Sequence, residues 1–362
     1  MLKFAITTTD FANMDTADSE PQPGRSKKGG GLTLKDVAKI AGVAPISASR
    51  ALNTPDAVSP ELLKKVRAAV ELTGYVPNMV AGGLASKNSK LVAAVVPTII
   101  GPVFQDMVQA LTETLADAGY QVMLGQSGYE NSREDALLEA IIGRRPAGVV
   151  LTGIMRSAQA RRRLLNSGIP VVETWDLTPT PIDMLVGFSH EKIGSEVAQF
   201  LHARGRRRVA TISGMDERSK RRAAAFSEAA VRLGMAHPGE PAIPTCMVPA
   251  PTTLGSGRSG LSELLARTPD IDAVFCSSDL LALGVMIEAQ FKNIAIPAQL
   301  AVIGFGDLNF SRDLQPQLTT VRIDGMTIGS TAARFILDRT AGRNIAEPVC
   351  DIGFRIVERD SV

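Results

Sequence analysis

The chain has 362 residues, 45% of them hydrophobic, and a formal charge of only +2. This length indicates two or three domains, and the hydrophobic content excludes a fibrous or wholly disordered protein. The three cysteines form no CxxC pair, so neither a disulfide framework nor a thiolate metal site is expected.

The charged residues are unevenly distributed along the chain. Residues 25–90 contain eleven Lys or Arg against four Asp or Glu, whereas the segments before and after them each carry a small negative balance. A basic segment joined to a nearly neutral body is typical of a protein that contacts nucleic acid or another anionic surface at one end only.

Neither export nor a membrane span is expected. The apolar stretch of residues 91–107 is interrupted by Pro97, Gly101 and Pro102, and it is shorter than the ~20 apolar residues that a spanning helix needs. Near the start, Asp10 precedes any apolar region of the kind found in signal peptides. A cytoplasmic location, where cysteines stay reduced, is therefore predicted.

Residues 1–31 lack apolar periodicity and are predicted to form a disordered tail. Over residues 32–76 the sequence predicts three short helices, which begin after Thr33, at Pro45 and after Ser59. Gly42 is predicted to end the first helix and Gly74 the third. Together they form a compact, basic bundle.

The first two of these helices have the spacing of a helix-turn-helix motif, with the turn at Ala41-Gly42-Val43. The second helix would then present Ser47, Ser49 and Arg50 to the major groove, where Arg pairs with guanine edges or phosphate. The alternative is a packing module whose charges are merely solvated.

A different pattern begins at residue 91, where short apolar runs alternate with amphipathic stretches. The runs are LVAAVVP (91–97), YQVMLG (120–125), AGVVLTG (147–153), IPVVET (169–174), MLVGFS (184–189), RVATISG (208–214), DAVFCSS (272–278) and LAVIGFG (300–306). Apolar strands alternating with helices predict parallel sheets covered on both faces, and their number suggests two doubly wound α/β lobes. In such sheets a ligand binds at the carboxyl ends of the strands.

The head also carries a family resemblance. The run TLKDVAKIAGVAPISASRALN (33–53), followed by VSPELLKKVRAAVELTGYVPN (58–78), resembles the DNA-binding head of the LacI family of bacterial transcription repressors. The resemblance continues through residue 362. Within the family the chain is most similar to the gluconate repressors, through motifs such as GPVF (101–104), DER (216–218) and DAVFCSSDLLALG (272–284).

This resemblance implies an α/β protein with a three-helix head and a periplasmic-binding-protein-like core of two doubly wound lobes. It implies a homodimeric transcription repressor, bound to a palindromic double-stranded operator and released when a small sugar acid such as gluconate binds between the lobes. The implied segments are a tail (1–31), the helix-turn-helix domain (32–76), a hinge helix or linker (77–90), and an effector-binding and dimerisation core (91–362) with lobes 91–189 plus 318–331 and 190–317 plus 332–362.

The resemblance also assigns the DNA contacts. Base contact falls to the start of the second helix, and Leu84 corresponds to the hinge leucine that wedges into the minor groove, with an ordinary linker residue as the alternative. Pro45 departs from the polar or aromatic residue common at its position, because it offers no side-chain hydrogen bond. The implied DNA-binding residues are Thr33, Leu34, Pro45, Ile46, Ser47, Ser49, Arg50, Asn53, Tyr75, Asn78 and Leu84.

Effector contacts are implied on strand-end loops of both lobes, at Thr98, Phe104, Trp175, Asp176, Arg218, Arg222, Ser278, Gly306 and Asp307. Ser278 and Gly306 stand where sugar- and purine-binding relatives commonly carry asparagine and aspartate. Losing a carboxylate while keeping Arg218 and Arg222 favours an anion. Three alternatives stay open. The arginines could belong to a solvated basic helix start, and Phe104 and Trp175 could serve only in core packing. Asp307 could also restore a carboxylate to the site.

An enzyme and an exported sugar-binding protein are the competing functions. The nucleophile elbow GxSxG and the phosphate loop GxxxxGK[ST] do not occur, and the three histidines are not spaced as HExxH. We therefore expect no catalysis, no metal and no cofactor. The basic head and the lack of a signal peptide argue against a transport protein.

Overall fold

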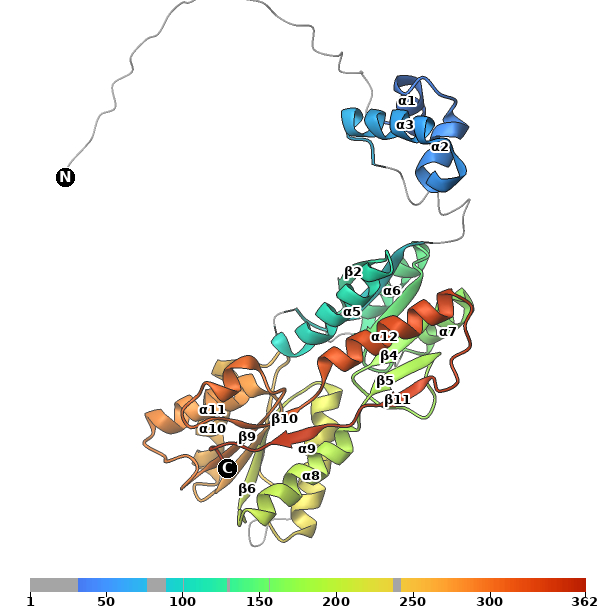
Figure 1. Cartoon of the computed structure of the whole chain (residues 1–362). Coiled ribbons are helices and arrows are strands. Elements are labelled where there is room, and N and C mark those ends of the chain that lie inside the picture. The colour runs from blue at the N-terminus through green and yellow to red at the C-terminus, as the bar shows by residue number, and fades with distance from the viewer. Residues whose placement is uncertain (1–31, 77–88, 100, 129–130, 156, 237–241) are drawn as a thin grey trace, which may run out of the picture. The chain divides into compact units, whose positions relative to one another are not determined.

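The computed structural model describes residues 32–362 except 77–88, 100, 129–130, 156 and 237–241 (Figure 1). The chain divides into two compact units, residues 1–82 and 83–362. The hinge residues 77–88, with Asn78 and Leu84, lie outside the described residues, as does the tail.

The described part of the first unit is a small helical bundle. It contains α1 (Leu34–Ile40), α2 (Pro45–Asn53), a 3₁₀ turn η1 (Pro55–Ala57) and α3 (Pro60–Thr73), so the three predicted helix starts are confirmed. Ser59 caps α3 by accepting a hydrogen bond from the Leu62 amide at 3.3 Å. Alanine and valine side chains fill the core between the helices, which keeps the helices close: Val37, Ala38, Ala48, Ala51, Val66 and Ala69.

The second unit is built on two six-stranded sheets. The first has the order β11-β5-β4-β3-β1-β2 and the second the order β12-β10-β9-β8-β6-β7. All strand pairs are parallel except β10 with β12. The first sheet contains β1 (Leu91–Val96), β2 (Gln121–Gln126), β3 (Gly148–Thr152), β4 (Val171–Thr174), β5 (Met184–Gly187) and β11 (Val349–Asp351). The second contains β6 (Val209–Gly214), β7 (Thr245–Val248), β8 (Ala273–Cys276), β9 (Ala301–Phe305), β10 (Thr319–Arg322) and β12 (Arg355–Val357).

Helices cover both sheets, as Figure 1 shows. They are α5 (Gln105–Asp117), α6 (Asn131–Gly143), α7 (Ala158–Ser167), α8 (His190–Ala203), α9 (Glu217–Arg232), α10 (Leu254–Arg267), α11 (Asp279–Phe291) and α12 (Gly325–Thr340), with 3₁₀ turns η2 (Pro102–Phe104) and η3 (Asn309–Arg312). The main helix pairs are α5 with α12, α8 with α9, and α10 with α11. The predicted fold of two doubly wound α/β lobes is confirmed.

The expected lobe boundaries near the C-terminus are wrong. Strand β10 pairs with β9, so residues 319–322 belong to the second lobe and not to the first. Helix α12 packs on α5, and β11 pairs with β5, which places residues 325–351 in the first lobe. Strand β12 then returns to the second. The chain therefore crosses between the lobes three times, and periodicity alone does not show which sheet a three- or four-residue strand joins.

One sequence pattern has a purely structural explanation. GSGRSG (255–260) matches the GxGxxG fingerprint of dinucleotide-binding loops, but all three glycines lie inside α10. A Cβ on Gly257 would stand 2.2 Å from the Leu281 carbonyl oxygen, and one on Gly284 would stand 2.1 Å from the Leu254 oxygen. These glycines let α10 and α11 approach closely.

Candidate functional site

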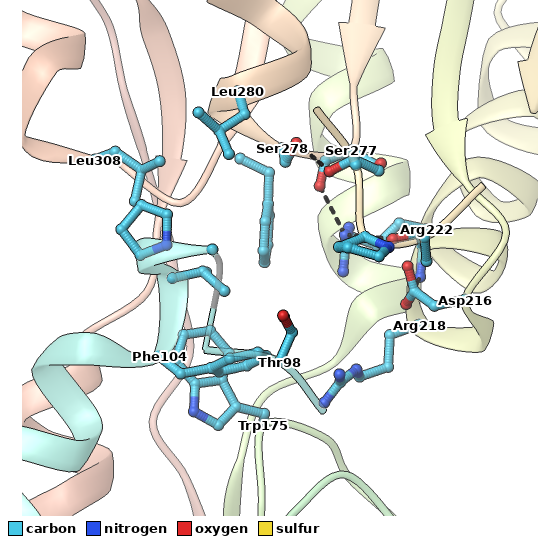
Figure 2. A pocket seen from close by; sticks show the side chains of 18 of the residues that line it. Thr98, Phe104, Trp175, Asp216, Arg218, Arg222, Ser277, Ser278, Leu280 and Leu308 are labelled. Carbon is cyan, nitrogen blue, oxygen red and sulfur yellow. Dashed lines mark hydrogen bonds between the residues drawn. The ribbon is translucent and has the colours of Figure 1, made fainter. Parts of the chain in front are cut away.

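A cavity of about 100 Å³ lies between the two lobes, at the carboxyl ends of their strands (Figure 2). The first lobe contributes the segment after β1 and the residue after β4, and the second contributes the segments after β6, β7, β8 and β9. The lining residues used below are Thr98, Phe104, Trp175, His190, Asp216, Arg218, Arg222, Ser278 and Phe305.

Arg222, on α9, is the most heavily bonded charged group of the cavity. Its Nη1 donates to Nδ1 of His190 at 2.9 Å, and its Nη2 donates to the Ser277 carbonyl at 3.0 Å. The guanidinium lies 3.9 Å from the centroid of the Phe305 ring. Burial lowers the pKa of Arg222 to about 10, so the group stays charged at neutral pH.

His190, the first residue of α8, connects the lobes. Its Nε2 lies 3.0 Å from the Trp175 carbonyl oxygen of the first lobe, while its Nδ1 faces Arg222 of the second. A carbonyl only accepts and a guanidinium only donates, so the ring is neutral with its proton on Nε2. Burial lowers the pKa of His190 well below 6.5, and Arg222, Arg218 and Arg221 lower it further.

Arg218 extends toward the first lobe. Its Nη1 lies 3.4 Å from the point where a Cβ on Gly153 would stand, and its guanidinium carbon is 5.6 Å from the centroid of Phe104. Nη1 is buried and has no hydrogen-bond partner among the described residues. A buried, charged donor of this kind gains free energy when an anion accepts its hydrogen bond.

Asp216 is the carboxylate of the cavity. It caps α9 by accepting a hydrogen bond from the Ser219 amide at 3.1 Å. Burial alone would raise the pKa of Asp216, but Arg222, Ser219 and Arg218 outweigh burial and the pKa is lowered. With His190 neutral, the charged groups that line the cavity are two guanidiniums and one carboxylate.

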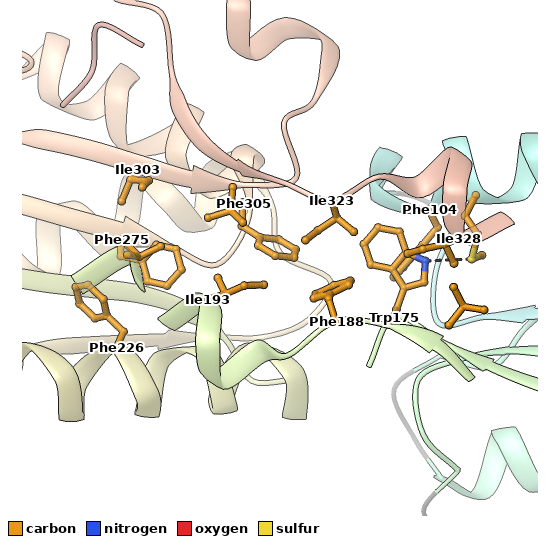
Figure 3. Packing of buried hydrophobic residues seen from close by; sticks show 14 of the residues in the cluster. Phe104, Trp175, Phe188, Ile193, Phe226, Phe275, Ile303, Phe305, Ile323 and Ile328 are labelled. Carbon is orange, nitrogen blue, oxygen red and sulfur yellow. Dashed lines mark hydrogen bonds between the residues drawn. The ribbon is translucent and has the colours of Figure 1, made fainter. Parts of the chain in front are cut away.

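Phe104 and Trp175 line the cavity and also belong to the core (Figure 3). The Trp175 ring meets Phe104 edge-on at 5.1 Å and Phe188 at 5.7 Å, and its Nε1 donates to the Met107 sulfur at 3.0 Å. Trp175 has a φ of +65°, which is uncommon for a bulky residue and marks a strained position. Phe104 and Trp175 therefore have both roles: they pack in the core, and they also form part of the cavity wall.

The structure brings together six of the nine sequence-predicted effector residues. Thr98, Phe104, Trp175, Arg218, Arg222 and Ser278 line the cavity, and Ser278 also caps α11 and bonds Thr252. The other three do not line it.

Asp176 pairs with Arg221. Asp307 pairs with Arg322 and Arg359, and together with Gly306 it lines a separate hollow of about 580 Å³. Asp307 therefore does not restore an acid to this cavity.

Sequence reasoning missed His190, Asp216 and Phe305 as cavity residues. His190 and Asp216 each stand at a helix start that directly follows a strand, and that position was the available signal. Phe305 is the last residue of β9, and its signal was its place at the carboxyl end of a strand.

The recognition face of the head is set by α2. Pro45, Ile46, Arg50 and Asn53 are exposed, and Ser47 and Ser49 are half-buried, whereas Ala48 and Ala51 on the opposite side pack into the bundle. This spacing leaves one helix face open to solvent. Of the remaining expected contacts, Thr33 is exposed, and Leu34 and Tyr75 are half-buried.

Two kinds of feature are absent from the described part of the chain. It contains no cluster of three or more His, Cys, Asp or Glu side chains arranged to hold a metal ion. Within the same residues, no helix has both the length and the apolar character that crossing a membrane requires.

A helix-turn-helix head and a two-lobed core with an interlobe cavity define a DNA-binding regulator that responds to a small molecule. Residues 33–78 match the family described as bacterial regulatory proteins, lacI family, and residues 198–362 match the periplasmic binding protein-like domain. The transcriptional regulator GntR of Pseudomonas aeruginosa is 37% identical, over 91% of this chain and 95% of that protein. The chain belongs to the LacI family.

Solved structures agree with this assignment. A LacI-family regulator from Silicibacter pomeroyi superposes with a TM-score of 0.84 at 31% identity, covering 91% of this chain and 99% of that one. The regulator GntR from Chromobacterium violaceum has a TM-score of 0.71 at 33% identity, covering 75% and 98%. The protein is therefore a transcription regulator, and the enzyme and transport-protein alternatives are set aside.

Proposed function

We propose that this regulator is a cytoplasmic, homodimeric repressor that leaves a palindromic operator when a small sugar acid, with gluconate as the prototype, binds between the lobes. The observation that carries the effector class is the unsatisfied, buried Nη1 of Arg218 in a cavity that also holds Arg222. A carboxylate can pair with such groups through charge-assisted hydrogen bonds.

The composition of the cavity supports an anion over a neutral sugar. Its walls include the rings of Phe104, Trp175 and Phe305, and such apolar walls reduce screening of the charges by water. The guanidinium of Arg222 is held by His190 and Ser277, so it is pre-organised for a ligand. The remaining polar groups, including Thr98 and Ser278, suit the hydroxyls of a sugar acid.

The DNA-binding residues of this proposal are those of the helical head and the hinge. The exposed face of α2, with Ile46 and Arg50, would enter the major groove, and Leu84 of the hinge would wedge into the minor groove. A homodimer follows from the operator, because two heads related by a two-fold axis bind two half-sites.

Regulation follows from linkage. An effector shifts the equilibrium only if it binds the DNA-incompetent arrangement more tightly than the competent one. A cavity formed by both lobes meets this condition when a change in the angle between the lobes alters its contacts. Bound sugar acid would then lower operator affinity.

Operator release by gluconate and by glucose, followed by fluorescence anisotropy, tests the effector class. We expect gluconate and not glucose to release the DNA, and Arg218→Ala to weaken gluconate binding by about 2 kcal/mol, the cost of a lost hydrogen bond to a charged group. Arg232→Ala, an exposed arginine at the other end of α9, is the matched control. Release by glucose alone would contradict the proposal.

A further inference from the structure

A second hollow, of about 560 Å³, opens on the other side of Arg218. It shares Asp216, Arg218 and Ala250 with the inner cavity, so the two spaces adjoin at these residues. We refer to the second space as the outer chamber. It is lined from the first lobe by the ends of β1, β2, β3 and β4 and by α6, and from the second by the segments after β6 and β7 and the start of α9.

The outer chamber is acidic, in contrast to the inner cavity. Among the described residues, its lining holds the carboxylates of Glu134, Asp176, Asp216 and Glu217 and the cations of Arg218 and Lys220. Arg221 pairs with Asp176, and Lys220 pairs with Glu217. The balance of charge thus changes sign between the two adjoining spaces.

The outer chamber also suits hydroxyl groups. Ser127 and Thr152 lie in its wall, and the Thr152 hydroxyl is buried with no hydrogen-bond partner among the described residues. A polyol can donate to carboxylates and can exchange hydrogen bonds with serine and threonine. A carboxylate can accept from the same hydroxyls, but it cannot donate to the carboxylates of the chamber.

We propose that the effector lies across Arg218, with its carboxylate in the inner cavity and its hydroxyl-bearing tail in the outer chamber, so that the site accepts sugar mono-acids and rejects the diacids of the same length. This inference rests on the proposed function and narrows its ligand class. The two spaces adjoin, and a six-carbon chain spans roughly 6 Å between its ends, since each C–C bond is about 1.5 Å long.

The discrimination has an electrostatic cause. A second carboxylate at the far end of the ligand would lie near Glu134, in a wall where Asp176 and Glu217 already occupy the cations of Arg221 and Lys220. Like charges repel, and they do so more strongly in a partly buried site than in water. Rotating the ligand end for end does not help a diacid, because one carboxylate remains in the outer chamber. A terminal hydroxyl carries no such penalty.

Gluconate and glucarate provide the test, because they share six carbons and the hydroxyls on C2 to C5 and differ only at C6. Isothermal titration of the full-length protein is carried out at pH 8, because burial raises the pKa of Glu134 and a high pH favours its ionised form. We expect glucarate to bind about tenfold or more weakly than gluconate.

Three variants test whether the carboxylates of the outer chamber cause the weaker binding of glucarate. Glu134→Gln should narrow the ratio of the two dissociation constants, and so should Glu217→Gln, which changes an exposed side chain and does not threaten folding. Glu139→Gln is the matched control, since Glu139 also lies on α6 but pairs with Arg163 away from the chamber. Its ratio should stay at the wild-type value.

The outcomes separate the two proposals. If gluconate does not bind at all, the proposed function fails and this inference fails with it. Should gluconate bind while glucarate binds equally well, only the inference is overturned. A ratio that stays unchanged in both chamber variants would also overturn it, because the discrimination would then have another origin.

Discussion

Single side chains of the cavity also contact both lobes, and His190 is the clearest example. Its two ring nitrogens bond a backbone carbonyl in one lobe and a guanidinium in the other. Protonating Nδ1 would remove the acceptor for Arg222 and place a second positive charge beside it. The lobe contact therefore depends on a neutral imidazole.

This dependence predicts a pH effect on stability. The pKa of His190 is lowered by burial and then by Arg222, Arg218 and Arg221 in the native state, whereas in the unfolded chain it is about 6.5. Below pH 6.5 the unfolded state binds a proton that the native state does not, so the free energy of unfolding falls as the pH falls. This contribution is fully present above pH 6.5 and is lost progressively as the pH falls below 6.5.

His190→Gln tests the pH effect, because a glutamine amide can both donate to the Trp175 carbonyl and accept from Arg222. Urea unfolding at pH 7.5 and 5.5 should show a smaller loss of stability in the variant than in the wild-type protein. An identical loss in both proteins would mean that other groups, such as the buried carboxylates, account for the acid sensitivity.

Residue-scale placement also explains where sequence reasoning about the cavity fell short. The place of Arg218 and Arg222 at the cavity was predictable, because both lie near the start of α9, which directly follows β6. Asp307 was not, because Gly306 at φ +130° and Asp307 at φ +50° take the chain through a turn directly after β9. The Asp307 carboxylate then pairs with Arg322 and Arg359, and that pairing depends on residues far along the chain.

At the scale of elements, the close approach of α10 and α11 predicts a sharp contrast between two glycines of one helix. A Cβ on Gly257 would meet the backbone oxygen of Leu281 at 2.2 Å, and backbone cannot move aside cheaply. Gly257→Ala should therefore destabilise the protein by about 1 to 3 kcal/mol in thermal or urea unfolding.

Gly255 supplies the matched control. It lies two residues earlier on the exposed side of α10, where the nearest atom to an added Cβ is 3.8 Å away. Gly255→Ala should stabilise the helix by up to about 1 kcal/mol, as alanine does in helix interiors. If both variants behaved alike, the close contact between the helices would not be the reason for Gly257.

The elements themselves were largely predictable. Eight apolar runs correspond to β1 to β6, β8 and β9, because strands buried on both faces are continuously apolar. The strands that were missed are β7, β10, β11 and β12, which have three or four residues each and contain threonine, arginine or aspartate. Short edge strands and threonine-rich strands lack the apolar signal, and only pairing with a distant neighbour defines them.

At the scale of the whole molecule, the charge distribution separates two tasks. We expect the basic segment to supply the DNA contacts, whereas the nearly neutral core places two arginines in its cavity. Affinity for DNA in general depends on many phosphate contacts, whereas the choice of sequence depends on the few side chains that reach base edges. Arg50 is exposed on α2, and we expect it to read base edges.

Arg50→Ala should therefore weaken operator binding by about 1 to 3 kcal/mol and leave binding to unrelated DNA less affected. The measurement is an anisotropy titration at fixed salt with operator and scrambled duplexes, because phosphate contacts make both affinities salt-dependent. Lys65→Ala on α3 removes one positive charge from the same domain, where it pairs with Glu61, and should keep the ratio of the two affinities. Equal losses on both duplexes in Arg50→Ala would assign Arg50 to the phosphate backbone, and the reading of bases would then fall to Ile46 and Ser47.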